Sequence, residues 1–524
     1  MTISNDPAAS PRTLFINAAL VGKPAGRYAV LVDGGVIVNI SATSVVDVPE
    51  GTAVVDLGRA DGSQQWLSPG LIDWHTHFTM NTLATRRLDL SKAKSAAAVL
   101  SAVAAHIDDP AYDEGGRFVA RDLRNGEWPD AEQLTRAALD AISATKPIVL
   151  VFNGYHSIQT NTAGLKLSGR DTDGEHAGHD GFLLEADAFG FLVHLQDTAD
   201  AAVLDRWVIG EAERAASLGV TEVVDLEFAQ SIESWERRTE KGFRSLRVHI
   251  GFYPHHLDDA LARGLRTGDV IPHTNGLVTA GPFKLITDGS LGSQTAYCCD
   301  HYPGNPSNRG ILAFQGDEID TLCLRATTNG LRLAVHAIGD DALRLVLDKL
   351  EAHSAKGDHP LRGSTIEHAQ LVHLDDLPRF HKLGLIASIQ PRHLVDDREL
   401  CHKFWPGREP RAYAFKAIVD AGIPIKLGSD CPVAQLDPWE ALACAITRAG
   451  PGEEAFVKEQ IIDLDTAYAA STHNGKLHIA EGERADLVIL GSNPLEQDAA
   501  GLRAMVVEGT LLGGNWTYRR GAKA

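Results

Sequence analysis

The sequence has few cysteines and no long hydrophobic run. Its 524 residues include six cysteines, none at the paired spacing of a zinc motif and too few for a disulfide framework in a chain of this size. The best apolar stretch, residues 96–107, falls short of the roughly 20 residues that cross a bilayer. Residues 1–11 lack the basic and then apolar layout of a signal peptide. We therefore expect a protein of the reducing cytoplasm with no membrane partner.

Positive charge is also scarce. The chain has 49 basic and 69 acidic side chains, a formal net charge of −20, and no basic run. Such a surface disfavours phosphate backbones and anionic membranes, so we expect no nucleic-acid partner. Hydrophobic residues make up 44% and charged residues 23%, which is ordinary for a globular protein. The length favours a large central domain with an accessory domain.

Both ends of the chain are predicted to be rich in β-strands. Short apolar runs there are separated by Gly, Asp and Pro turns, the pattern of a small β-unit. We expect one β-sandwich-like domain built from residues 1–66 and 480–524. The strands expected in it are residues 13–16, 28–32, 36–40, 53–56, 485–490 and 505–509, with a last strand near Trp516.

Residues 67–479 alternate short apolar strands with helix-like segments, which predicts an α/β fold with a parallel sheet wrapped by helices. The number of strands suits a TIM-type (β/α)8 barrel, whose catalytic groups lie at the C-terminal strand ends. The gap after the first strand is too long for one crossover, so we expect an insertion at about 85–215 that includes the apolar run 147–152. The barrel strands are expected at residues 70–77, 220–226, 246–252, 282–287, 331–336, 364–368, 385–390 and 425–430.

A histidine pair ends the first expected barrel strand. His75 and His77 are two residues apart, so on an extended strand both side chains point the same way. Two imidazoles on one face suit zinc or a similar cation. Two solvated or core histidines are the alternative, since the chain has 22 histidines. The position just after a Pro-Gly turn favours the metal pair.

Polar residues also stand on four of the later strands. Lys284 lies on an apolar strand, where a bare ammonium needs either a salt-bridge partner or a chemical change. Carboxylation by carbon dioxide would make it an anionic ligand able to bridge two cations. His336, His368 and Asp430 each end a strand, although core histidines and a helix N-cap are the alternatives. Because all these strands would end at one barrel mouth, the combined set predicts one site.

These motifs together resemble the amidohydrolase superfamily, and within it the branch similar to N-substituted formamide deformylase. The resemblance spans nearly the whole chain and rests on residues 284–296, 336–340, 366–370, 428–433 and 485–488. It implies two divalent cations, expected as Zn²⁺ with Mn²⁺ or Fe²⁺ as alternatives. The residues implied as ligands are His75, His77, His336 and His368, with Lys284 as a carboxylated bridge and Asp430 as ligand and general base.

The resemblance implies a hydrolase that cleaves a C–N amide-type bond of a small molecule with metal-activated hydroxide. N-substituted formamides, other amides and cyclic amides all suit such a site. Asp430 would orient the hydroxide and pass its proton to the departing nitrogen. His156, in the insertion, could stabilise the developing oxyanion or merely pack there. Arg392 and His393, just past the seventh strand, could meet an acidic group of the substrate, although exposed charged residues need no such role.

Three rival interpretations remain open. The first is a deaminase with the same barrel. Members of that kind resemble one another in a one-metal site with a Glu three residues after the strand-five histidine, whereas this chain has Gly339 there. A non-catalytic barrel protein would have lost ligands, yet every expected position is filled. Cysteine chemistry at Cys431 lacks a readable partner histidine. Residues 123–128 depart from the branch pattern, which leaves the substrate open, and a homodimer is expected only from the size of the fold.

Overall fold

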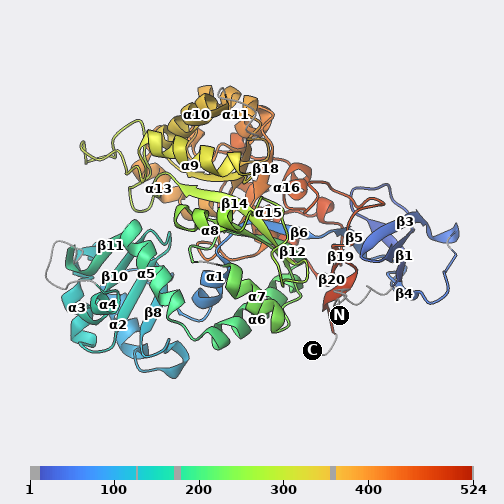
Figure 1. The fold of residues 1–524 in the computed structure, drawn as a ribbon, viewed down its shortest axis with the longest axis horizontal. Coiled ribbons are helices and arrows are strands. Elements are labelled where there is room, and N and C mark those ends of the chain that lie inside the picture. Colours follow the sequence, from blue (N-terminus) through green and yellow to red (C-terminus); the bar gives the residue numbers. More distant parts are fainter. Residues whose placement is uncertain are drawn as a thin grey trace.

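The computed structural model describes residues 12–45, 47–124, 128–169, 179–229, 231–354 and 361–521. Three sheets organise this part of the chain (Figure 1). A parallel barrel lies in the centre, a sheet built from both chain ends lies on one side, and a smaller sheet lies on the other. Among the described residues, no helix is both long and apolar enough to cross a membrane.

Eight parallel strands form the barrel, in the order β6 and then β12 to β18. The ring nearly closes where Thr76 pairs in parallel with Cys431, and the Asp430 amide donates to the His75 carbonyl at 2.7 Å. The TIM-type barrel expected from the sequence is confirmed. The strands are β6 (Leu71–Thr76), β12 (Val220–Asp225), β13 (Arg247–Phe252), β14 (Val278–Ile286), β15 (Leu333–Ala337), β16 (Thr365–His368), β17 (Ile386–Ile389) and β18 (Ile425–Leu427).

The barrel strands are parallel because helices return the chain along the outside of the sheet. Strands of such a sheet are covered on both faces, and every residue of β12 and β15 is buried. Acidic residues at the start of α10, Asp340 and Asp341, complement the helix dipole. The helices around the barrel are α1 (Phe78–Ala84), α6 (Ala201–Ser217), α7 (Ile232–Glu240), α8 (Leu257–Ala262), α9 (Gly316–Thr328), α10 (Asp340–Ser354), α11 (Leu377–Lys382), α12 (Pro391–Asp396), α13 (Arg398–Phe404), α14 (Phe415–Asp420), α15 (Pro438–Thr447), α16 (Leu464–Ala470) and α17 (Ala499–Arg503).

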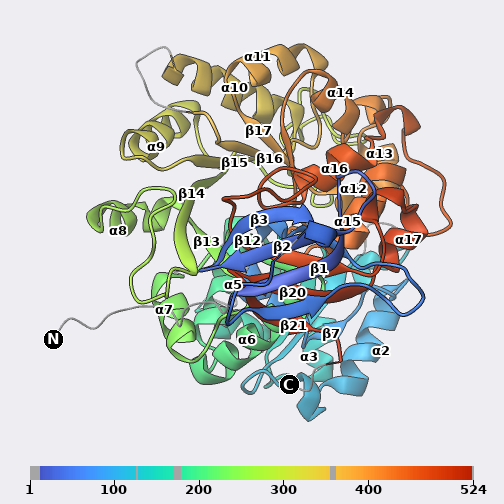
Figure 2. The same ribbon diagram turned by 90° about the vertical axis from the view of Figure 1, so that its right-hand side faces the viewer.

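Both chain ends contribute to one sheet, as the sequence predicted. Figure 2 shows its N-terminal and C-terminal strands side by side in front of the barrel. The strand order is β21-β20-β19-β5-β1-β2-β3, and β4 pairs with β1. The expected domain limits, 1–66 and 480–524, stay predictions, and this sheet extends to Pro69. Its strands are β1 (Thr13–Leu20), β2 (Tyr28–Asp33), β3 (Val36–Ala42), β4 (Ala53–Asp56), β5 (Trp66–Pro69), β19 (Leu487–Leu490), β20 (Val507–Leu512) and β21 (Asn515–Arg519).

A separate small sheet lies between β6 and β12 in the sequence. Its strand order is β11-β10-β9-β8-β7, and the apolar run noted at residues 147–152 forms its central strand β9. Helix α2 begins at a Ser95 cap whose side chain accepts from the Ala98 amide. The elements are β7 (Leu88–Asp89), β8 (Phe118–Leu123), β9 (Ile148–Phe152), β10 (Ser157–Thr160), β11 (Phe182–Leu184), α2 (Ala96–His106), α3 (Arg136–Ile142), α4 (Thr162–Leu167) and α5 (Ala186–Asp197).

Candidate metal centre

His75 and His77 come from the end of β6 and lie buried in the barrel mouth, 1% and 7% exposed. Their ring centroids are 5.7 Å apart, and Phe228 stacks on the His77 ring at 4.9 Å. The His75 Nδ1 lies 2.6 Å from Glu367 Oε2. A carboxylate that accepts from Nδ1–H fixes the tautomer in which Nε2 has a free lone pair. His75 is therefore oriented with Nε2 towards the cavity.

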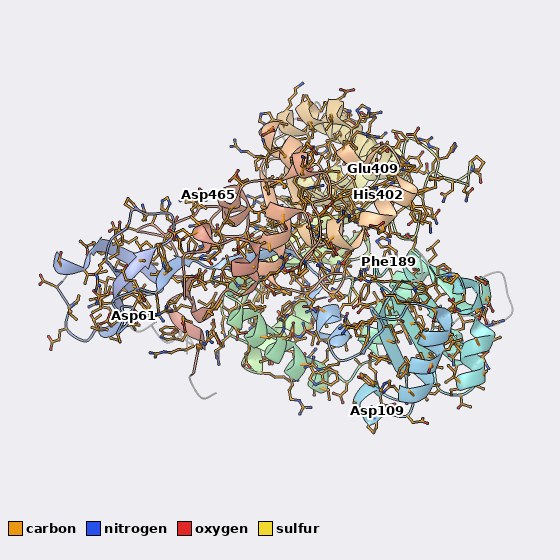
Figure 3. All side chains as sticks on the ribbon, turned by 180° about the vertical axis from the view of Figure 1, so that it is seen from behind. Asp61, Asp109, Phe189, His402, Glu409 and Asp465 are labelled. Carbon is orange, nitrogen blue, oxygen red and sulfur yellow. The ribbon has the colours of Figure 1, made fainter. Side chains whose placement is uncertain are left out.

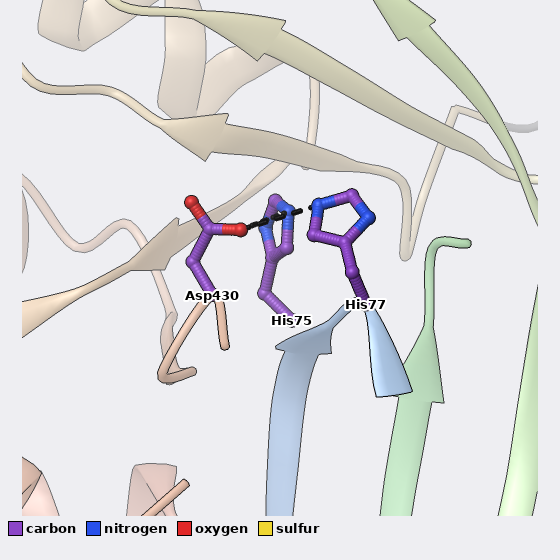
Figure 4. A group of neighbouring side chains, drawn as sticks. All are labelled: His75, His77 and Asp430. Atoms are coloured by element: carbon purple, nitrogen blue, oxygen red, sulfur yellow. Dashed lines mark ion pairs between the residues drawn. The ribbon is translucent and has the colours of Figure 1, made fainter. Parts of the chain in front are cut away.

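Asp430 faces both histidines. Its Oδ1 is 3.4 Å from His75 Nε2 and 3.3 Å from His77 Nε2 (Figure 4). Burial raises the pKa of Asp430, but His75, His77 and His368 lower it more, so the pKa lies well below its usual value. Asp430 has a φ of 56°, a left-handed conformation that side chains rarely adopt. Strained backbone of this kind concentrates at functional sites.

Lys284, His336 and His368 complete the mouth. The Lys284 Nζ lies 3.5 Å from His75 Nε2, and burial lowers the lysine pKa towards the neutral amine that carboxylation requires. The His368 ring centroid is 5.0 Å from that of His75 and 4.5 Å from that of His336. Burial lowers the pKa of His336 and of His368 well below the usual value. Both imidazoles are therefore neutral and able to act as ligands.

These residues fit a divalent metal. At this mouth, the described residues provide no hydrogen-bond partner for three buried ring nitrogens: His77 Nδ1, His368 Nδ1 and His393 Nε2. Two groups, His75 with His77 and Asp430, and His368 with His393 and Asp430, each hold their ligand atoms within 4.8 Å of one another. Neutral imidazoles around an ionised carboxylate are the donors that zinc and similar cations prefer.

All the residues that the sequence predicted as ligands lie at one barrel mouth. The metal-binding role itself stays a prediction. The residues so placed are His75, His77, Lys284, His336, His368 and Asp430.

His156 reaches the same mouth from the inserted sheet, in the turn between β9 and β10. Its ring centroid is 5.9 Å from that of His336, and its Nδ1 lies 2.8 Å from Glu185 Oε2. Burial lowers the pKa of His156, but Glu185 raises it more, and the pKa lies above its usual value. Glu185 also accepts from the Thr295 hydroxyl. The inserted sheet thus adds an imidazole, whose charged form Glu185 favours, beside the candidate metal ligands.

Arg392 and His393 are neighbours that point to different places. The described residues that line the cavity include His393 but not Arg392. The Arg392 guanidinium lies 3.0 Å from Glu440 Oε1 and 3.0 Å from Asp396 Oδ1. The structure therefore brings only His393 to the predicted site, where its Nε2 lies 3.6 Å from Asp430 Oδ2.

A cavity of about 440 Å³ opens over these residues. One wall is apolar and combines barrel and insertion: Phe189 stacks on Phe228 at 4.8 Å, and Tyr253 lies beside Phe228 at 5.0 Å. Figure 3 labels Phe189 at the junction of the inserted sheet and the barrel. The cavity lining also includes polar residues such as Arg124 and Gln370. The cavity thus has room for a small molecule with an apolar group.

Three acidic residues of the site had no role in the sequence-based prediction. Glu367 orients His75, and Glu185 holds His156. Asp288 accepts from the backbone amides of Tyr297, Ile338 and Gly339, and burial raises its pKa to about 7. Glu367 directly precedes His368 within residues 366–370 noted in the sequence analysis, and that position was the available signal. Glu185 has no neighbouring histidine in the sequence.

Comparison with known proteins assigns the family. A model of the amidohydrolase family matches residues 61–518, so the chain belongs to this family, as the motifs predicted. N-substituted formamide deformylase of Arthrobacter pascens is 26% identical over 94% of this chain and 95% of its own length. Protein LONG AFTER FAR-RED 3 of Arabidopsis thaliana is 28% identical over 86% of this chain and 82% of its own length.

A solved structure shares the fold. It is an uncharacterized metal-dependent hydrolase from Pyrococcus horikoshii, with a TM-score of 0.76 at 23% identity. The likeness covers 93% of this chain and 99% of that one.

Proposed function

We propose that this chain is a metal-dependent hydrolase that cleaves a C–N amide-type bond of a small molecule. The single observation that supports this most is the convergence of buried neutral imidazoles on the ionised carboxylate of Asp430 at the barrel mouth. The relative named N-substituted formamide deformylase makes N-substituted formamides the first substrates to test. Other amides and cyclic amides follow.

The proposed metal ligands divide into two sets that share a bridge. His75, His77 and Asp430 would hold one divalent cation, and His336 and His368 would hold the other. Lys284, once carboxylated on Nζ, would be the ligand that both cations share. Its side chain is buried and adjacent to His75, where a free ammonium is costly. We propose Zn²⁺ at both positions, with Mn²⁺ or Fe²⁺ as alternatives, since these cations accept the same donors.

A bound divalent cation lowers the pKa of water and polarises a substrate carbonyl. Asp430 accepts the proton of the attacking water and delivers it to the departing nitrogen, while a C–O bond forms and the C–N bond breaks. His156, held by Glu185 with its pKa raised, donates to the developing oxyanion. The apolar wall of Phe189, Phe228 and Tyr253 receives the substituent on the nitrogen.

The geometry favours hydrolysis over deamination. A deaminase would need an acid at position 339, but a Cβ on Gly339 would overlap the backbone of Tyr297, so no larger side chain fits without rearrangement. The lysine at position 284 also favours two cations over one.

The test is a panel of N-alkyl and N-benzyl formamides, acetamides, cyclic imides and amino-substituted heterocycles, incubated with Zn²⁺-loaded protein. We expect release of amine and carboxylate that is lost with Asp430→Asn and retained with Asp61→Asn, an exposed carboxylate that is not part of the cavity lining. Ammonia release from the heterocycles would overturn the proposal in favour of a deaminase. Turnover that survives Asp430→Asn would place the reaction elsewhere.

A further inference from the structure

His393 lies where the seventh barrel strand passes into helix α12. β17 ends at Ile389 and α12 begins at Pro391, so His393 is in the first turn of the helix. Its side chain is 8% exposed, and its ring stacks beside that of His368 at 5.9 Å between centroids. Its Nε2 has no hydrogen-bond partner in the described part of the chain. A buried ring nitrogen without a partner costs free energy, and a bound cation or ligand beside Nε2 would remove that cost.

The distance from His393 Nε2 to Asp430 Oδ2 is that of two ligands on one cation. Two ligand atoms about 2.1 Å from a tetrahedral zinc ion are about 3.4 Å apart. The observed separation is 3.6 Å, beyond hydrogen-bond reach. It is close to the 3.4 Å and 3.3 Å that separate Asp430 Oδ1 from His75 and His77. His368, His393 and Asp430 also hold their ligand atoms within 4.8 Å of one another.

The two oxygens of Asp430 therefore face different histidines. Oδ1 faces His75 and His77, whereas Oδ2 faces His393. A single carboxylate whose two oxygens face different imidazoles can bridge two cations that the imidazoles complete. The left-handed backbone of Asp430 aims the carboxylate between the two groups.

We propose that His393 is a metal ligand and that Asp430 spans both cation positions, with Oδ2, His368 and His393 joining His336 in holding the second cation. The remaining lone pairs of the carboxylate keep its role in proton transfer. This proposal rests on the proposed function and changes the role of His393 from substrate recognition to metal binding. The substrate is then recognised by the remaining cavity wall. The alternative is that His393 only donates a hydrogen bond that positions Asp430.

Two substitutions separate these roles. In His393→Gln the side-chain amide can still donate to Asp430 Oδ2, but it has no imidazole lone pair for a metal. His393→Ala removes both. His402→Ala, a histidine with half of its side chain exposed on helix α13, is the matched control (Figure 3). The measurement is zinc per full-length chain after loading and dialysis, with Co²⁺ titration of the metal-free protein followed by its visible absorption.

The native chain and His402→Ala should bind two equivalents of zinc. Both His393 variants should retain about one, with the affinity for the second Co²⁺ weakened more than 100-fold, since loss of even an outer partner of a ligand costs about 10–100-fold. Two equivalents with native affinity in His393→Gln would overturn the proposal. Native protein with one equivalent would also overturn it, because there would be no second position. Native protein that binds no zinc or Co²⁺ would instead contradict the proposed function itself.

Discussion

Removing the charge of Glu367 should weaken metal binding without disturbing the fold. Glu367 Oε2 lies 2.6 Å from His75 Nδ1, and both side chains are almost fully buried, at 2% and 1% exposure. Burial raises the pKa of Glu367, but His75 lowers it more, to about 2, so the carboxylate is ionised at neutral pH. Glu367→Gln keeps the shape and can still accept from Nδ1–H through its carbonyl oxygen. Only the negative charge is lost.

The expected magnitude follows from what that charge does. An ionised acceptor makes the imidazole a more basic ligand, and losing such a partner costs about 10–100-fold in metal affinity. This corresponds to about 1.4–2.7 kcal/mol of binding free energy. Burial lowers the pKa of His75, so its ring is neutral. The negative charge of Glu367 therefore acts on the dipole of a neutral imidazole and not on a full positive charge. We therefore expect the lower half of the range, about 10–30-fold.

The assay is zinc affinity measured by competition with a chromophoric chelator near neutral pH. Glu399→Gln is the control, because Glu399 is an exposed carboxylate that lines the same cavity. Thermal unfolding of the metal-free proteins tests the fold. Native zinc affinity in Glu367→Gln would refute the reasoning, and so would an equal loss in the control.

The fold makes two further predictions, both measured by chemical unfolding of metal-free protein. Asp205→Asn should lose about 3 kcal/mol at pH 7, because its fully buried carboxylate pairs with three cationic side chains. Burial raises the pKa of Asp205, but its cationic partners lower it more. The loss of unfolding free energy should therefore persist at pH values above 3.8, the pKa in the unfolded chain, and shrink at lower pH. A loss that instead shrinks at high pH would contradict the assignment. Gly339→Ala should cost about 1–3 kcal/mol, because its Cβ would overlap the Tyr297 backbone. Gly190→Ala, in open space within α5, should instead stabilise by about 0.5–1 kcal/mol, and equal effects of the two alanines would argue against the packing account.

Much of the fold could be predicted because its signals are local. Alternating strands and helix-like segments indicated the barrel, and turn-rich apolar runs at both ends indicated the shared sheet. The arrangement of the insertion was not predicted, because pairing among its five strands depends on contacts that no local pattern specifies. The last barrel strand, expected at 425–430, ends at Leu427. Asp430, inside the expected range, has a left-handed backbone conformation that a regular strand does not contain.

The predicted site was based on residues at strand ends. Two features of the backbone explain what that prediction missed. Strand alternation implies that Glu367 and His368 point to opposite faces, yet both reach the mouth, because His368 has a φ of 70° and leaves the extended conformation. Arg392 and His393 stand on a helix, where successive side chains point about 100° apart, so only one of them faces the cavity. Such departures from regular backbone cannot be seen in spacing alone.

The most direct test of the central claim is metal content per chain, with Lys284→Ala beside the native sequence. Lys284 is buried, with Nζ 3.5 Å from His75 Nε2, so its loss should remove the bridge between the two cations. We predict two metals per native chain and a sharp fall in Lys284→Ala. One metal per chain that Lys284→Ala leaves unchanged would contradict the bridged site and favour a single-metal aminohydrolase.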